Sequence, residues 1–297
     1  MSRSARDDGR ADAQRPTADR QSDHQRQDRS IDVPADGLAL PRGDRREAVE
    51  CRERVYQLRG SESGLLTTVG AFRVVPAADL ADGRSTPEAF KEDLRSLSNQ
   101  GLIERRTITI NQQAMRVVVL TRDGKALLEN QREAPVDRPQ RFHAGLVKPR
   151  ELAHDAQMYR LYQAAASRIE DNGGRITRIV LDYELKRDYQ TFLNRRDRPE
   201  DADRHEDMAA FAAARHLPII DGHLELPDLR LEYETADGRL EERDLELVTE
   251  HYSRGQLAGK ARAGFALYRA SGAGRLRGGA AHTGGTPIDP HHLEWLS

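Results

Sequence analysis

The fold of this chain is decided between Thr86 and Leu128, which read TPEAFKEDLRSLSNQGLIERRTITINQQAMRVVVLTRDGKALL. Thr86 can cap a helix whose first residue is Pro87, and the apolar residues that follow recur at helical spacing. Gly101 ends this helix, and two β-rich runs follow on either side of an Asn-Gln-Gln turn. A second helix can begin after Thr121, which is again a capping residue type. The stretch therefore predicts a helix, a hairpin and a second helix.

The segments before this stretch are predicted to be mainly helical. Ala48–Arg59 and Ser63–Gly70 are interpreted as helices, and Ala77–Leu80 as a short helix before the break at Gly83. Residues 46–132 thus form one patterned block.

Basic and amide side chains lie on this block where a DNA-binding module would present them. A helix in the major groove meets base edges, and a hairpin beside it reaches phosphates or the minor groove. The predicted DNA contacts are Lys91, Arg95, Ser98, Asn99, Arg105, Arg106 and Arg116. However, Glu92 and Asp93 share the helix, and residues 46–132 hold 14 basic against 12 acidic residues. A protein–protein adaptor that never touches DNA therefore stays an alternative.

The phrase DLRSLSNQGLIERR, followed by RVVVLTRDGKALLE, resembles the winged helix-turn-helix domains of MarR-like and PadR-like regulators. In that family a recognition helix is followed by a two-stranded wing. The resemblance implies double-stranded DNA as the partner.

A second patterned block covers residues 151–270. Its bend lies at Pro227–Asp228, where the parity of the apolar positions changes, and Asp237–Gly238 gives a turn signal between two strands. The predicted elements are a helix over Glu151–Asn172, a strand over Arg175–Leu185, a helix over Glu206–Arg215, a short strand over Leu217–Ile220, strands on either side of the turn, and a helix over Ser253–Ala270.

This order resembles the core of PD-(D/E)XK nucleases. Together with the first block and the phrase HDAQMYRLY, it is similar to the replication-relaxation family of plasmid and mobile-element proteins. The resemblance implies that Asp228 and Glu246 bind a metal and that Lys260, moved from the strand to the following helix, completes the catalytic set. Two converging carboxylates can hold Mg²⁺, which lowers the pKa of a bound water and neutralises charge on the phosphate.

The sequence departs from the nuclease pattern in two respects, so a degenerate domain without nuclease activity stays an alternative. Val248 stands where the strand lysine would be, and no strand is evident after the last helix. Asp228 and Glu246 could equally be surface carboxylates on an open sheet face. His154 and Asp155 are interpreted as helix-end residues, and Tyr159 and Tyr162 as core residues.

Composition bounds the remaining possibilities. The 297 residues are 37% hydrophobic and 32% charged with a formal net charge of −2, and no apolar run is long enough to span a bilayer. The single cysteine, Cys51, cannot form an internal disulfide, so a cytoplasmic protein without a membrane partner is expected. Residues 1–45 and 271–297 are predicted to be flexible tails, and residues 133–150 a linker.

These observations predict an α+β protein with a winged helix followed by a nuclease-like domain. The leading hypothesis is duplex DNA binding in transcriptional control or in replication or transfer of a mobile element, with a degenerate nuclease-like domain. The alternative from another class is a Mg²⁺-dependent DNA nuclease or nickase that uses Asp228, Glu246 and Lys260. The sequence leaves open whether the chain forms a homodimer or binds a protein partner.

Overall fold

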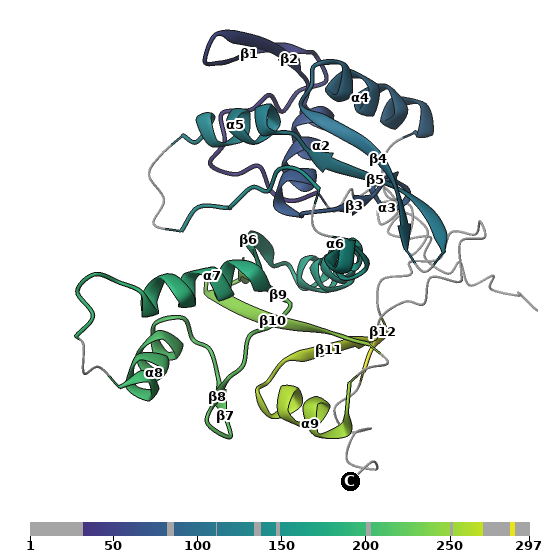
Figure 1. Ribbon diagram of the computed structural model, residues 1–297. Coiled ribbons are helices and arrows are strands. Elements are labelled where there is room, and N and C mark those ends of the chain that lie inside the picture. Colours follow the sequence, from purple (N-terminus) through teal and green to yellow (C-terminus); the bar gives the residue numbers. More distant parts are fainter. Residues whose placement is uncertain are drawn as a thin grey trace, which may run out of the picture.

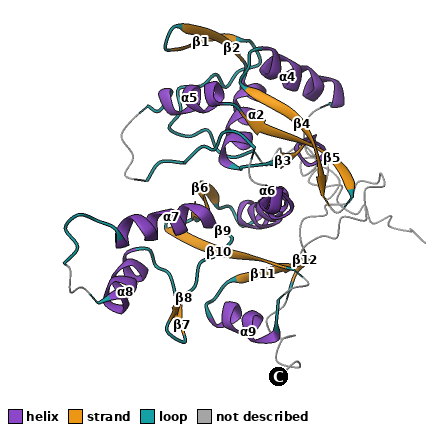
Figure 2. Cartoon of the chain, viewed as in Figure 1, coloured by secondary structure: helices purple, strands orange, loops and turns teal. Residues whose placement is uncertain are grey.

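The computed structural model describes residues 32–81, 86–110, 112–133, 138–146, 149–199, 203–249, 252–269 and 286–288 (Figure 1). Residues 1–31 of the predicted N-terminal tail, and all of the predicted C-terminal tail except residues 286–288, lie outside the described residues. We call residues 32–133 the N-terminal half and residues 149–288 the C-terminal half. Helices and strands alternate in both halves, so the predicted α+β content is confirmed (Figure 2).

The N-terminal half begins with a β-hairpin. Strands β1 (Glu47–Cys51) and β2 (Arg54–Leu58) pair antiparallel, with Val49 opposite Tyr56. The prediction of a helix over residues 48–59 is therefore wrong. Alternate residues of both strands are buried, and Arg52 adopts a positive φ of 56° that closes a tight turn.

A three-stranded sheet and four helices complete this half. Strand β5 lies between β3 and β4, and the long β4–β5 hairpin is antiparallel, with Ile103 opposite Leu120. The predicted helix, hairpin and helix are confirmed. The elements are α2 (Gly60–Ala71), β3 (Val75–Pro76), α3 (Ala77–Ala81), α4 (Pro87–Asn99), β4 (Ile103–Ile110), β5 (Gln113–Leu120) and α5 (Arg122–Asn130).

The C-terminal half is built on a five-stranded mixed sheet in the order β12-β11-β10-β9-β6. Neighbouring strands are antiparallel except β10 and β11, which are parallel. A small hairpin of β7 and β8 lies apart from this sheet. The elements are α6 (Pro149–Asp171), β6 (Arg175–Leu181), α7 (Asp182–Leu193), α8 (Arg204–Ala214), β7 (Ile219–Ile220), β8 (His223–Leu224), β9 (Leu229–Glu234), β10 (Leu240–Val248), α9 (Arg254–Arg262), β11 (Ala266–Arg269) and β12 (Thr286–Pro287).

Two predictions for this half need correction. The strand expected to run to Leu185 ends at Leu181, because Asp182 begins α7. The helix expected to reach Ala270 ends at Arg262, and Ala266–Arg269 form the strand that sequence analysis did not find. Gly264 lies between them with a φ of +81°, which lets the chain turn out of the helix.

The two halves share one hydrophobic core. Phe72, after α2, contacts Tyr159 and Tyr162 of α6, with ring centroids 5.3 and 5.5 Å apart. Helix α6 lies between the N-terminal half and the five-stranded sheet (Figure 1). Its Leu152 and Ala156 also pack in a cluster that includes Val117 and Val119 of β5. The halves are therefore joined by side-chain packing as well as by the chain itself.

Two segments that were expected to lack structure pack against this core. Val33, Leu38 and Leu40 are buried, so residues well before Arg45 pack against the core. Within the predicted linker, the backbone N–H of His143 donates to Gly70 O at 2.8 Å, and that of Gly145 donates to Leu120 O at 2.8 Å. Gln140 of the same segment hydrogen-bonds to the backbone of Ile179 in the C-terminal half. Residues 138–146, which we call the strap, therefore contact both halves.

Candidate functional site

Helix α4 presents a basic face to solvent. Thr86 caps it by accepting a hydrogen bond from the backbone N–H of Ala89, as predicted. Phe90, Leu94 and Leu97 are buried on the inner face. Of the predicted contacts on the outer face, three are exposed and one is half-buried: Lys91, Arg95 and Asn99 are exposed, and Ser98 is half-buried.

Two of the three acidic residues of α4, Glu92 and Asp93, are held by arginines at the ends of the β1–β2 hairpin, and the third, Glu88, is exposed in the first turn. Arg59 Nη2 lies 2.6 Å from Asp93 Oδ1, and Asp93 is only 3% exposed. Arg46 Nη2 donates to Glu92 Oε1 at 3.1 Å and also binds the fully buried Glu62. The charges of Glu92 and Asp93 are therefore compensated from the side of the N-terminal hairpin, which the sequence does not reveal because its pattern was interpreted as a helix.

The β4–β5 hairpin carries the remaining predicted DNA contacts. Arg105, Arg106 and Arg116 are all exposed, and Arg106 forms an ion pair of 2.7 Å with Glu104 of the same strand. Within the described part of the chain, Lys91, Arg95, Arg105 and Arg116 form no ion pair. Four cations on α4 and the hairpin are thus available to an anionic partner.

A second candidate site lies at the edge between α6, α9 and the strands β9 and β10. Asp228 precedes β9, Glu246 lies near the end of β10, and Lys260 extends from α9. Lys260 Nζ is 3.2 Å from Glu246 Oε1, and Asp228 Oδ2 accepts a hydrogen bond from the backbone N–H of Leu247 at 2.9 Å. The three residues singled out by sequence are brought together here. They are not exposed on an open sheet face, since Glu246 is 2% exposed.

Two further side chains belong to this site that sequence analysis did not place there. His154 Nε2 lies 3.0 Å from Asp228 Oδ1, and the hydroxyl of Tyr252 donates to Glu246 Oε1 at 2.6 Å. The sequence predicts a helix-end role for His154 and assigns no role to Tyr252. The signal in the sequence that could have indicated His154 is its neighbour Asp155, since the two form an adjacent His-Asp pair near the start of α6. By contrast, Tyr159 and Tyr162 are buried, as expected of core residues.

Burial and neighbouring charges set the protonation of this site. Burial and the charge of Asp228 raise the pKa of Glu246 to about 7, although Lys260 and Tyr252 oppose the shift. Burial also disfavours ionisation of Asp228, but the hydrogen bonds from His154 and Leu247 and the charge of Lys260 lower its pKa overall. Burial disfavours a charged His154, yet its hydrogen bonds to Asp155 and Asp228 raise its pKa to about 10.

A second lysine lies close to the acidic pair. The backbone N–H of Asp182 donates to Asp228 O at 3.0 Å, and Lys186 Nζ binds Asp182 Oδ2 at 2.6 Å. Burial would lower the pKa of Lys186, but Asp182 raises it overall, and the charges of Asp228 and Glu246 add to the effect. Two of the five lysines in the chain are therefore near this site.

The side chains present do not fit a divalent metal in the observed arrangement. Mg²⁺ requires several oxygen ligands in octahedral geometry. Both oxygens of Asp228 and one of Glu246 already accept hydrogen bonds from protein donors. Among the residues that the structure describes, no three or more His, Cys, Asp or Glu side chains are arranged to hold a metal ion.

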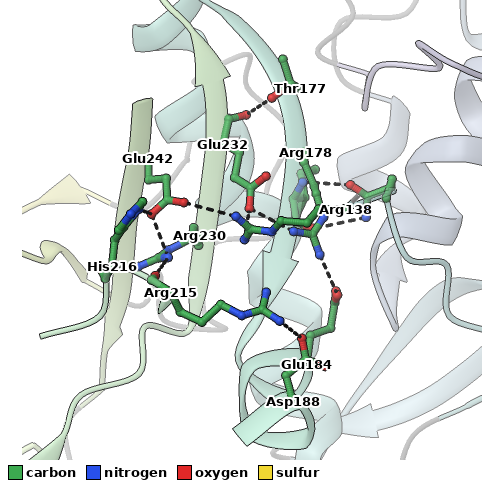
Figure 3. Close-up of polar contacts among 12 residues, drawn as sticks. Arg138, Thr177, Arg178, Glu184, Asp188, Arg215, His216, Arg230, Glu232 and Glu242 are labelled. Atoms are coloured by element: carbon green, nitrogen blue, oxygen red, sulfur yellow. Dashed lines mark hydrogen bonds and ion pairs between the residues drawn. The ribbon is translucent and has the colours of Figure 1, made fainter. Parts of the chain in front are cut away.

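A charged network covers another part of the sheet, beside a cavity of about 550 Å³ (Figure 3). Arg178 Nη1 binds Glu232 at 3.0 Å, and Arg138 of the strap binds the same carboxylate at 2.6 Å. Arg230 Nη1 lies 2.8 Å from Glu242. Since these charges are paired within the chain, we interpret the network as a structural link between the strap and the sheet.

Comparison with protein-family models, with curated proteins and with solved structures finds no match for this chain. In the described part of the chain, no helix combines the length and the apolar character that crossing a bilayer requires. Functional assignment therefore depends on the geometry of the two candidate sites.

Proposed function

We propose that this protein binds double-stranded DNA through a winged helix-turn-helix formed by α2 to α5. In this proposal α4 is the recognition helix and the β4–β5 hairpin is the wing. The winged-helix resemblance supports it through the order of elements, which runs helix, strand, short helix, helix and hairpin. By the same resemblance, the setting is transcriptional control or the replication or transfer of a plasmid or other mobile element.

The observation that carries the proposal is the separation of charge on α4. Its exposed cations, Lys91 and Arg95, have no acidic partner among the described residues, whereas two of its three acids, Glu92 and Asp93, are bound by Arg46 and Arg59 and only Glu88 is not. A helix that enters the major groove must approach phosphates closely, so unpaired cations on that face favour the encounter. The net charge of −2 for the chain is consistent with a local rather than a global attraction.

The test is a titration of a mixed-sequence duplex of about 30 base pairs with the full chain at several salt concentrations. We expect Arg95→Ala and Lys91→Ala to weaken binding about 5- to 100-fold and to lower the dependence on salt by about one ion each. Arg196→Ala is the matched control, because Arg196 is exposed and unpaired within the described residues but lies far from α4 in the sequence. If both α4 variants bind the duplex with unchanged affinity, α4 is not the recognition helix. Absence of any duplex affinity at physiological salt would favour the alternative that the protein is a protein–protein adaptor.

The nuclease resemblance gives a second candidate, a Mg²⁺-dependent nuclease or nickase, which the proximity of Asp228, Glu246 and Lys260 supports but their occupied oxygen atoms oppose. Strand β11, parallel to β10, supplies the final strand that this resemblance requires. The test is incubation of supercoiled plasmid with Mg²⁺ or Mn²⁺ and either the wild type or Asp228→Ala. Metal-dependent nicking that is lost in the variant would make this chain an enzyme. Equal retardation of the plasmid by both proteins without nicking would leave a DNA-binding protein.

A further inference from the structure

Two cations of the chain itself, His154 and Lys260, contact the acidic pair Asp228 and Glu246. The first is His154, whose Nε2 faces Asp228 Oδ1 at 3.0 Å and whose Nδ1 faces Asp155 Oδ1 at 3.3 Å. A carboxylate can only accept hydrogen bonds, so a ring that serves two carboxylates must donate from both nitrogens. His154 is therefore an imidazolium held between two acids.

The second internal cation is Lys260. Its ammonium group contacts three oxygens, namely Leu226 O at 2.9 Å, Glu225 Oε2 at 3.1 Å and Glu246 Oε1 at 3.2 Å. An ammonium group has three N–H donors, so these three acceptors satisfy it completely. The side chain is only 16% exposed, and its Nζ lies 5.1 Å from the centroid of Phe265. Lys260 is thus enclosed in the site, with no donor left for a substrate phosphate.

The acceptors that remain are too few for a divalent ion. Asp228 Oδ2 is bound by Leu247 N–H, and Glu246 Oε1 also accepts from Tyr252. One carboxylate oxygen of the acidic pair, Glu246 Oε2, is buried and has no hydrogen-bond partner. A divalent ion could gain oxygen ligands here only by displacing an internal cation, as at Lys260, which holds Leu226 O, Glu225 Oε2 and Glu246 Oε1.

We propose that His154 and Lys260 take the place of a divalent ion at Asp228 and Glu246, and that the resulting cluster is an electrostatic joint that fixes α6 and α9 to the ends of β9 and β10. The proposal is independent of DNA binding by α4. It assigns to the acidic pair a structural task where the nuclease resemblance implies catalysis.

The joint extends into the N-terminal half through Arg73. Its Nη1 lies 3.3 Å from Asp155 Oδ2, and its Nη2 binds Glu151 at 2.6 Å. Arg73 follows α2 directly after Phe72, so the aromatic contact and the ion pairs act at the same boundary. A continuous series of charged contacts therefore connects the N-terminal half with Asp228.

The test measures the response of the full chain to metal, using thermal unfolding in EDTA and with MnCl₂ or MgCl₂, and calorimetric titration of Mn²⁺. We expect no shift and no binding heat for the wild type. Lys260→Met should melt lower in EDTA, because it leaves Glu246 without its cation, and should gain a Mn²⁺-dependent rise of about 5 °C or more as the freed oxygens bind the ion. Lys260→Met combined with Glu246→Gln is the matched control and should lose that rise.

Two results would overturn the proposal. One is Mn²⁺ binding by the wild type that disappears in Asp228→Asn, which would show that the acidic pair takes a metal despite its internal cations. The other is a folded Lys260→Met protein that does not respond to metal, because Lys260 would then not occupy a cation position. If Lys260→Met does not fold, the wild-type titration alone decides. Neither result depends on the α4 variants, so the joint and DNA binding can fail separately.

Discussion

At the scale of single residues, the stability of the C-terminal half depends on buried charges that have several partners each. Arg230 is 1% exposed and binds both oxygens of Asp244, at 2.6 and 2.8 Å. It also donates to the backbone carbonyls of Arg215 and His216. A buried cation with this many acceptors cannot be removed without leaving a carboxylate and two carbonyl groups unsatisfied.

We therefore expect Arg230→Met to lower the free energy of unfolding by about 3–5 kcal/mol. The exposed control is Arg239→Gln, since Arg239 is 70% exposed and pairs with Asp237 at 2.8 Å. That variant should cost at most about 1 kcal/mol. Urea unfolding of the two proteins gives the comparison, and similar losses in both would contradict the structural role of Arg230.

His154 gives the fold a definite dependence on pH. Its folded-state pKa of about 10 lies above the ordinary value of 6.5, so the imidazolium stabilises the fold fully below pH 6.5. That contribution is lost as the pH rises through 10. We expect His154→Gln to cost about 1–2 kcal/mol near pH 6, a figure reduced for the partial exposure of the ring, and clearly less near pH 10. Urea unfolding at both pH values tests this, and a penalty that grows with pH would refute it.

At the scale of elements, periodicity and capping residues predict the structure well where these local signals are strong. The helix from Pro87, the β4–β5 hairpin and the helix after Thr121 are confirmed. The β1–β2 hairpin was missed because its turn contains neither Gly nor Asn, and Arg52 takes the positive φ instead. Strand β11 was missed because its four residues continue the apolar pattern of the preceding helix.

In the candidate sites, too, the sequence predicts residues that belong to a local pattern and misses contacts that only the fold creates. Asp228, Glu246 and Lys260 were predicted together by resemblance, and the structure places them in one cluster. His154 contacts Asp228 from 74 residues away in the sequence, and no local pattern records such a contact. Likewise, the compensation of Glu92 by Arg46 depends on a hairpin that local signals did not reveal.

The cap of α4 can be tested at this scale. Thr86 Oγ1 accepts from the backbone N–H of Ala89 at 3.1 Å, and this N–H would otherwise lack a partner within the helix. We expect Thr86→Ala to lower the free energy of unfolding by about 1 kcal/mol. Thr86→Ser retains the hydroxyl and should stay near the wild type. Denaturant unfolding of the three proteins measures the effect, and equal losses in both variants would show that the hydroxyl is not the stabilising group.

At the scale of the whole molecule, the two halves pack against one another through a shared core. The main core contains Leu65 and Val118 of the N-terminal half together with Leu231 and Leu245 of the C-terminal half. The strap adds polar contacts, since Gln140 exchanges two hydrogen bonds with the backbone of Ile179, at 2.8 and 3.1 Å. The orientation of the basic face of α4 relative to the acidic cluster is therefore fixed by packing.

This arrangement predicts that damage at the boundary is felt in both halves. Phe72 is 1% exposed and contacts Tyr159 and Tyr162, so we expect Phe72→Ala to cost about 3–5 kcal/mol. Hydrogen exchange should show that the slowest amides of β5 and β9 open with the same free energy in the wild type, and that both lose protection equally in the variant. Loss of protection confined to β5 would mean that the halves unfold independently. In that case Arg73 and the strap could not hold α4 at a fixed orientation to Asp228, and the charged contacts between the halves would be incidental to the fold.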